Sequence, residues 1–250
     1  MRTVLYLVVL FVSTVWYGLK ATIAGLLRLK RVPGGVYDNC GRDWARVCLR
    51  AAGVRVSVEG AEHLRADEPQ IVASNHASFF DILAIYGYLP VPVKFVAKKE
   101  LFAIPIFGQA LRAVGHVRLD RTHLKQAFGA YETAARQIAE GRLNMLVFPE
   151  GTRTRTGELQ PFKKGPFVLA IMARVPVVPA YVANTFGIQP KGSLVVHPRP
   201  IRILLGPRVP VDGLTVEDRD ALTEHVRVAV ALLKDRVDAE QRGGQVSAHL

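Results

Sequence analysis

The chain has 250 residues, of which 50% are hydrophobic, and this proportion excludes an intrinsically disordered protein. Lys and Arg number 33 against 21 Asp and Glu, and the resulting net charge of +12 indicates an anionic partner: a membrane surface, a phosphorylated substrate or a nucleic acid. The two cysteines, Cys40 and Cys48, are too few for a disulfide scaffold or a four-cysteine zinc site, and they are typical of a reducing compartment.

The N-terminal segment is strongly apolar. Residues 3–19 carry no charge, and as a helix they would extend about 25 Å, slightly less than the ~30 Å hydrocarbon core of a bilayer. A cleaved signal peptide and a buried helix of a soluble protein are the alternatives. Because no small-residue cleavage site directly follows the apolar run, we favour an uncleaved membrane anchor over residues 1–31.

Basic residues dominate the segment that follows. Residues 20–50 contain seven Lys or Arg but two Asp, so the positive-inside rule predicts that the C-terminal side of the anchor is cytoplasmic. Within residues 32–53 an apolar stripe runs beside Arg42, Arg46 and Arg50, which predicts an amphipathic helix. Two interpretations stay open: the helix lies on anionic headgroups, or it packs on the domain with a solvated arginine face.

Strand and helix patterns alternate after Gly53. We predict strands at 54–58, 70–74, 93–98, 116–119, 145–148, 175–182 and 201–206, and helices at 78–89, 101–114, 124–141, 167–173 and 215–237. Pro105 must begin or kink the second of these helices. The alternation predicts an α/β fold with a mostly parallel central sheet flanked by helices, over one catalytic domain at 54–237, followed by a flexible tail at 238–250.

The first chemically suggestive segment is NHASFFD, residues 75–81. His76 follows a buried strand, and Asp81 lies in the first turns of the next helix. Five residues on one helix would separate the two side chains by about 140°, so they can pair only if His76 lies in the turn. Asp81 would then accept a hydrogen bond from one ring nitrogen and leave the other free as a general base. The structural alternative is a core histidine beside a helix-capping aspartate.

The second segment is FPEGTR, residues 148–153. Gly151 would let the backbone approach a ligand closely, and Arg153 offers a planar fork that suits phosphate. Three further cations strengthen the positive field: Arg155, Lys163 and Lys164. A solvated basic loop is the alternative.

With these two segments, residues 54–210 resemble the glycerolipid acyltransferases typified by lysophosphatidate acyltransferase. NHASFFD resembles the catalytic His-x4-Asp block of that family, and FPEGTR resembles its third block. Residues 115–121 (GHVRLDR) resemble the second block, although Arg118 replaces an aromatic residue there. Residues 175–179 (VPVVP) resemble the fourth block, a strand that contains proline.

The resemblance implies acyl transfer from a thioester, either acyl-CoA or acyl carrier protein, to a glycerol hydroxyl, without a cofactor or a metal. His76 would remove the hydroxyl proton, and Asp81 would orient the ring and support the imidazolium. The residues that would hold the acceptor phosphate are Glu150, Gly151, Thr152, Arg153, Arg121 and Lys98.

The expected reaction acylates the sn-2 hydroxyl of 1-acylglycerol 3-phosphate to give phosphatidic acid, at a membrane, with the catalytic domain on the cytoplasmic side. Glycerol 3-phosphate or another lysophospholipid is the alternative acceptor. A basic membrane-binding protein without catalysis is the non-enzymatic alternative. Nucleic acid is not an expected partner, because the sequence lacks both aromatic–basic interleaving and a nucleic-acid module.

Overall fold

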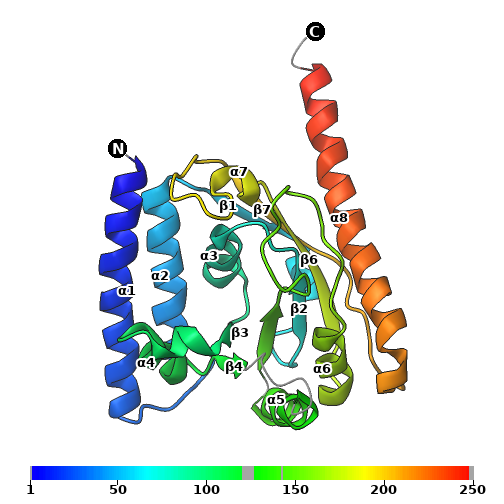
Figure 1. Ribbon diagram of the computed structural model, residues 1–250, viewed down its shortest axis with the longest axis horizontal. Helices are drawn as coiled ribbons and strands as arrows, with labels where there is room; N and C mark the ends of the chain where they lie inside the picture. Colours follow the sequence, from blue (N-terminus) through cyan, green and yellow to red (C-terminus); the bar gives the residue numbers. More distant parts are fainter. Residues whose placement is uncertain (1, 120–126, 142, 248–250) are drawn as a thin grey trace.

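The computed structural model describes residues 2–119, 127–141 and 143–247 (Figure 1). Within these residues seven strands form one sheet in the order β1-β7-β6-β2-β5-β3-β4. Neighbouring strands are parallel except for the β6–β7 pair. The predicted mostly parallel sheet is therefore confirmed. The strands are β1 Val56–Glu59, β2 Ile71–Ser74, β3 Val93–Lys98, β4 Val117–Leu119, β5 Asn144–Val147, β6 Val177–Ala183 and β7 Ile201–Leu205.

Helices cover both faces of the sheet, as Figure 1 shows. The helices α1 to α4 lie on one side, and α5, α6 and α8 lie on the other. Their bounds are α1 Arg2–Leu26, α2 Val36–Ala52, α3 Phe79–Tyr88, α4 Phe107–Val114, α5 Ala127–Gly141, α6 Gly165–Ala173, α7 Thr185–Ile188 and α8 Arg219–Ser247. Three short 3-10 helices complete the described elements: Ala61–His63, Lys99–Ala103 and Val216–Asp218.

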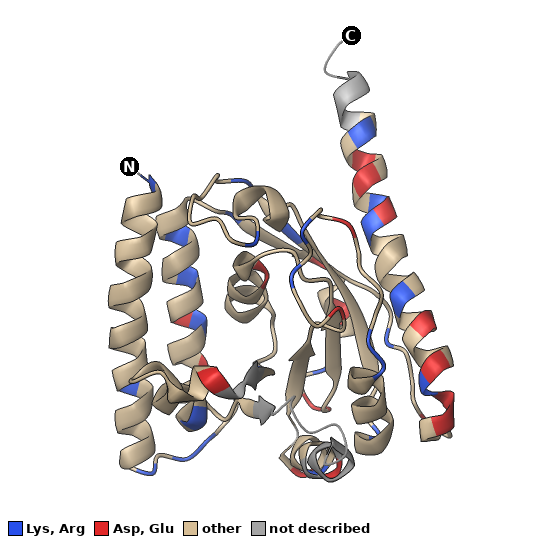
Figure 2. Cartoon of the chain, viewed as in Figure 1, with Lys and Arg blue, Asp and Glu red and all other residues tan. Residues whose placement is uncertain are grey.

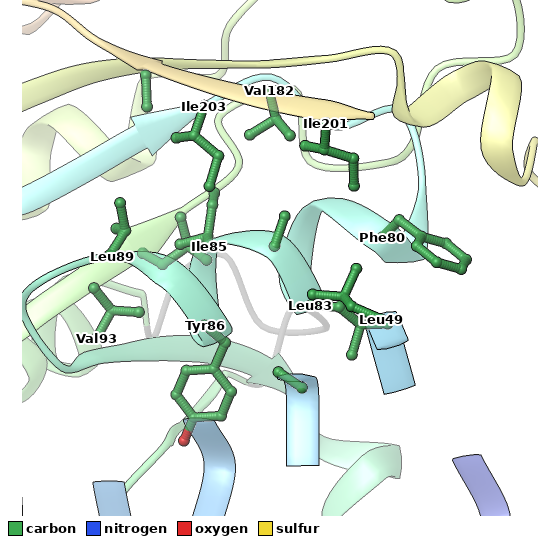
Figure 3. Packing of buried hydrophobic residues seen from close by; sticks show 14 of the residues in the cluster. Leu49, Phe80, Leu83, Ile85, Tyr86, Leu89, Val93, Val182, Ile201 and Ile203 are labelled. Atoms are coloured by element: carbon green, nitrogen blue, oxygen red, sulfur yellow. The ribbon is translucent and has the colours of Figure 1, made fainter. Parts of the chain in front are cut away.

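The central strands β2 and β5 are buried along their whole length, which explains why they read as continuous apolar runs. Side chains alternate along β2, so Val72 joins the core under α2 and α3, whereas Ile71 and Ala73 join the core under α5, α6 and α8. Figure 3 shows the first of these cores, in which α3 lies between the sheet and Leu49 of α2.

Helix α2 packs between α1 and α3. A β-carbon at Gly41 would lie 2.2 Å from the Tyr86 ring, so the absence of a side chain allows α2 and α3 to approach closely. Arg46 donates from Nε to the Gly87 carbonyl oxygen of α3 at 2.8 Å, and Arg50 is exposed. These contacts favour the interpretation of a helix packed on the domain.

Helix α1 packs along its length on α2 and α4, and its outer face remains apolar and exposed. Among the described residues it is the one helix that is long and apolar enough to cross a membrane by length and composition. The charge-free run ends before Lys20, and the helix continues through this exposed residue to Leu26, within the predicted anchor of residues 1–31. A single exposed lysine does not interrupt a helix, because its charged end reaches solvent.

The expected helix at 101–114 is divided at Pro105, the residue that was expected to begin or kink it. Pro105 has no N–H to donate and Ile106 adopts a φ of 65°, so a 3-10 helix ends at Ala103 and α4 begins at Phe107. The last helix was predicted to end near Val237, but α8 continues to Ser247 and extends beyond the body of the protein (Figure 1). A capping box formed by Thr215 and Asp218 precedes α8.

Candidate active site

His76 and Asp81 meet at the carboxyl edge of the sheet. Strand β2 ends at Ser74 and α3 begins at Phe79, so His76 lies in the connecting turn, as the spacing required. Its Nδ1 atom lies 2.8 Å from Oδ2 of Asp81. The sequence thus predicted the position of both residues and their contact.

Asp81 also caps the helix on which it stands. Its Oδ2 atom accepts hydrogen bonds from the backbone N–H groups of Ala77 at 2.7 Å and Ser78 at 2.8 Å. Ser78 completes the capping box by accepting from the N–H of Phe80. Capping and pairing do not exclude each other here, because one carboxylate serves both. It is 0% exposed, so its orientation is set by the protein alone.

The tautomer of His76 follows from these partners. An oxygen that already accepts from two backbone N–H groups acts as a carboxylate acceptor, so Nδ1 of His76 must donate to it and carry the proton. Nε2 then holds the lone pair, as a general base requires. The ring stacks on Phe148 with centroids 4.0 Å apart, and the side chain is 14% exposed.

The FPEGTR loop adjoins His76 because β2 and β5 are neighbouring parallel strands whose carboxyl ends share one edge. Gly151 adopts a φ of 74°, and its N–H donates to the Phe148 carbonyl oxygen at 2.9 Å, which closes a tight turn. Beyond the turn, the Thr154 N–H donates to the His76 carbonyl oxygen at 2.8 Å. The two predicted motifs therefore form one site.

Two lysines lie beside the loop. A β-carbon at Gly151 would lie 2.8 Å from Nζ of Lys163, so this side chain covers the turn. Lys191 donates from Nζ to Oγ1 of Thr152 at 2.8 Å. The sequence did not single out Lys191, because it follows α7 and belongs to none of the motifs. Arg153 is half-buried, and no carboxylate of the described residues lies within ion-pair distance of it.

The remaining predicted ligands are only partly described. Lys98 is the last residue of β3, which lies beside β5 in the sheet. The Lys98 side chain is not among those that the structure describes. Arg118 belongs to β4, and its side chain is likewise outside the description. Arg121 lies outside the described residues.

Neither cysteine belongs to this site. Cys40 and Cys48 are free and buried in α2. Burial raises the pKa of the Cys48 thiol to about 11, so the thiol is protonated near neutral pH and is a poor nucleophile. This agrees with acyl transfer that needs no cysteine-bound acyl intermediate.

Known proteins resemble this chain over a region that contains all four motifs. Residues 55–183 match the family model described as Acyltransferase. The chain is 36% identical over 168 residues to a 1-acyl-sn-glycerol-3-phosphate acyltransferase of Limnanthes douglasii, covering 67% of this chain and 59% of that protein. It is 34% identical over 194 residues to the alpha form from Homo sapiens, covering 77% of this chain and 68% of that protein. It therefore spans less than two thirds of the length of the plant relative.

The overall fold has a close counterpart among solved structures. The crystal structure of the 1-acyl-sn-glycerophosphate (LPA) acyltransferase PlsC from Thermotoga maritima superimposes with a TM-score of 0.77 at 28% identity. The match covers 93% of this chain and 95% of that one, so it includes the helices outside the family model as well as the sheet. The chain belongs to the acyltransferase family.

Proposed function

We propose that the protein transfers a fatty acyl group from acyl-CoA or acyl carrier protein to the sn-2 hydroxyl of 1-acylglycerol 3-phosphate. The product is phosphatidic acid, and the step belongs to phospholipid synthesis. The observation that carries the proposal is the 2.8 Å contact between His76 and Asp81 beside a loop rich in cations. The names of the similar proteins, each an acyltransferase for this lysolipid, support the choice of acceptor.

The proposed mechanism is a direct transfer. Nε2 of His76 takes the hydroxyl proton as the acceptor oxygen attacks the thioester carbonyl carbon. The C–S bond then breaks, and the departing thiolate receives the proton from the imidazolium. Asp81 stabilises the imidazolium through the Nδ1 hydrogen bond. A positioned general base contributes about 10²–10⁴-fold to the rate.

We assign the acceptor phosphate to the loop that follows β5. The backbone turn at Gly151, the hydroxyl of Thr152 and the guanidinium of Arg153 would face the phosphate, and Lys191 would add a cation through its contact with Thr152. Lys98 and Arg121 remain candidates from the sequence. Glu150 is not among these ligands, because both of its carboxylate oxygens accept hydrogen bonds from the chain itself.

The direct test is a substrate panel with the purified protein in mixed micelles. Release of thiol from acyl-CoA or acyl carrier protein is measured with lysophosphatidic acid, glycerol 3-phosphate, lysophosphatidylcholine and monoacylglycerol as acceptors. Phosphatidic acid should form fastest from lysophosphatidic acid. A faster reaction with glycerol 3-phosphate or lysophosphatidylcholine would reassign the acceptor, and thiol release with no acceptor would identify a thioesterase.

Replacing Lys191 with glutamine should raise the KM for lysophosphatidic acid by about threefold to tenfold while the KM for acyl-CoA stays unchanged, because a point charge near the phosphate is removed. Steady-state kinetics at 0.05 and 0.5 M salt measure the effect, which should shrink at the higher salt. Lys164→Gln is the matched control. The sequence placed Lys164 in the positive field of the loop, but in the structure it is an exposed lysine paired with Asp220 at 2.7 Å. Equal KM values in both variants would remove Lys191 from the phosphate site.

We infer that α1 holds the protein in one leaflet on the cytoplasmic side of the membrane. Its inner face packs on α2 and α4 along the whole helix, so α1 could not cross a bilayer without taking these helices with it. Figure 2 shows that α1 carries almost no charge. Its exposed apolar residues are Val4, Leu5, Val8, Phe11, Val12, Trp16, Leu19, Ile23 and Leu26.

The anchor is best tested on its outer face, because deleting α1 would also remove Tyr6 and Ala21 from the cores. The double substitution Phe11→Glu with Trp16→Glu should weaken binding to vesicles of anionic phospholipid by at least about tenfold, because burying each of these side chains is worth about 1.5–3 kcal/mol. Flotation with vesicles measures it. The control is Val228→Glu with Leu232→Glu, which changes exposed apolar residues on α8. Equal flotation of the two double variants would contradict the inference.

A further inference from the structure

Glu150 is the acidic residue of the FPEGTR loop, and its surroundings differ from those of a phosphate ligand. It is 4% exposed. Its Oε1 atom accepts from the backbone N–H of His76 at 2.8 Å. Its Oε2 atom accepts from the side-chain amide of Gln160 at 2.8 Å and from the Gln160 backbone N–H at 3.3 Å. Both oxygens are thus bound by donors of the chain itself, and a carboxylate would repel a phosphate.

The backbone of His76 is held on its other side by the same loop. The Thr154 N–H donates to the His76 carbonyl oxygen at 2.8 Å, while Glu150 accepts from the His76 N–H. Gln160 also donates to the Thr152 carbonyl oxygen at 3.1 Å, so it links Glu150 to the segment that carries Thr154. The loop therefore holds both peptide groups of His76, and Asp81 holds its ring.

We propose that Glu150 is a positioning residue for His76, held in place by Gln160, and that it does not contact the acceptor. This deepens the proposed function and rests on His76 being the base. The direction of the Nε2 lone pair depends on the position of the His76 backbone as well as on that of the imidazole ring. A displacement of about 1 Å at a reacting atom can lower a rate by about 10²-fold.

Glu150 is a buried carboxylate, so its contact with His76 depends on the hydrogen-bond donors that stabilise its charge. Burial raises the pKa of the Glu150 carboxyl, and the hydrogen bonds from His76 and Gln160 act in the opposite direction. Removal of a donor should therefore loosen the contact with His76 even when Glu150 itself is unchanged. Gln160 supplies two of these donors, and replacing its side chain removes the shorter of the two hydrogen bonds, so it offers a second way to test the proposal.

The test compares two variants with a control in the same loop. In Glu150→Gln the amide oxygen can still accept from the His76 N–H, but the NH₂ group meets the donors of Gln160. We expect kcat to fall by about 10- to 100-fold while the KM for lysophosphatidic acid and for acyl-CoA each change less than about twofold. Gln160→Ala should give the same pattern with a fall in kcat of about fivefold. Glu158→Gln, which alters an exposed acid of this loop, should leave all three constants unchanged.

Competition by inorganic phosphate reports on the acceptor site separately from the size of kcat. Its inhibition constant against lysophosphatidic acid should be the same in wild type and Glu150→Gln. If Glu150→Gln retains its kcat while the KM for lysophosphatidic acid or the phosphate inhibition constant rises about tenfold, Glu150 binds the acceptor and the proposal is overturned. An unchanged kcat in Glu150→Gln with no other effect would also overturn it. If thermal unfolding shows that Glu150→Gln is not folded, the kcat and KM values of Gln160→Ala decide between the same outcomes. A wild-type protein that acylates only another acceptor would overturn the proposed substrate, and the same measurements would then be made with that acceptor.

Discussion

Replacing His76 with alanine should lower kcat by about 10²–10⁴-fold, because it removes the group that takes the hydroxyl proton in the transition state. The KM values should change little, because neither substrate depends on Nε2 for ground-state binding. His225→Ala is the matched control, since His225 is an exposed histidine of α8. Thiol release measures the rate, and thermal unfolding verifies that both variants fold. A rate for His76→Ala within threefold of wild type would exclude His76 as the base.

Asp81→Asn should also lower kcat, by about 10²–10⁴-fold. An asparagine oxygen can replace Oδ2 as the acceptor of the three hydrogen bonds, but it carries no charge to stabilise the imidazolium. The new NH₂ group would then occupy the position of Oδ1, which is buried and has no hydrogen-bond partner among the described residues. An unpaired buried donor costs about 1–3 kcal/mol, so the free energy of unfolding should fall too. A loss of stability with kcat retained would leave Asp81 with the capping role alone.

The sequence predicted those parts of the fold that local patterns encode. Alternating Val56 and Val58 indicated a half-buried strand, and the short apolar runs at 70–74 and 145–148 indicated the strands that the structure shows as β2 and β5, both fully buried. Pro105 was expected to begin or kink the helix at 101–114, and the structure divides the helix there. The predicted end of the last helix near Val237 was wrong, because α8 continues to Ser247.

The His76–Asp81 contact was predictable because both residues flank one strand-to-helix turn, only five positions apart. Glu150 and Lys191 were not, because their partners are distant in the sequence: Glu150 bonds to a backbone 74 residues earlier, and Lys191 bonds to a hydroxyl 39 residues earlier. Such contacts depend on which strands are neighbours, and periodicity does not encode the order of strands in a sheet. The FPEGTR motif indicated that its residues act at one site, but not that the acid faces His76.

Arg153→Lys should raise the KM for lysophosphatidic acid by about tenfold with kcat nearly unchanged. A planar guanidinium can donate two hydrogen bonds to phosphate, whereas lysine supplies a point charge, and the loss of one charge-assisted hydrogen bond corresponds to about tenfold in affinity. Arg153→Ala should in addition lower kcat by about 10²-fold, since an acceptor without this contact no longer aligns its hydroxyl with Nε2 of His76. Kinetics with donor and acceptor varied separately measure both effects, and Arg155→Lys is the control, because Arg155 is the exposed arginine two positions on.

The phosphate of the acceptor itself gives the sharper comparison. Monoacylglycerol offers a hydroxyl for acylation but no phosphate, so wild type and Arg153→Ala should acylate it equally slowly if Arg153 acts through phosphate. With lysophosphatidic acid the two enzymes should differ by at least about 10²-fold in kcat/KM. The effect of Arg153→Ala then depends on whether the acceptor carries a phosphate, and this dependence measures the contact between Arg153 and the phosphate. If Arg153→Ala slows both acceptors by the same factor, the residue supports the loop that holds His76, and the phosphate must be bound by other cations such as Lys163 and Lys191.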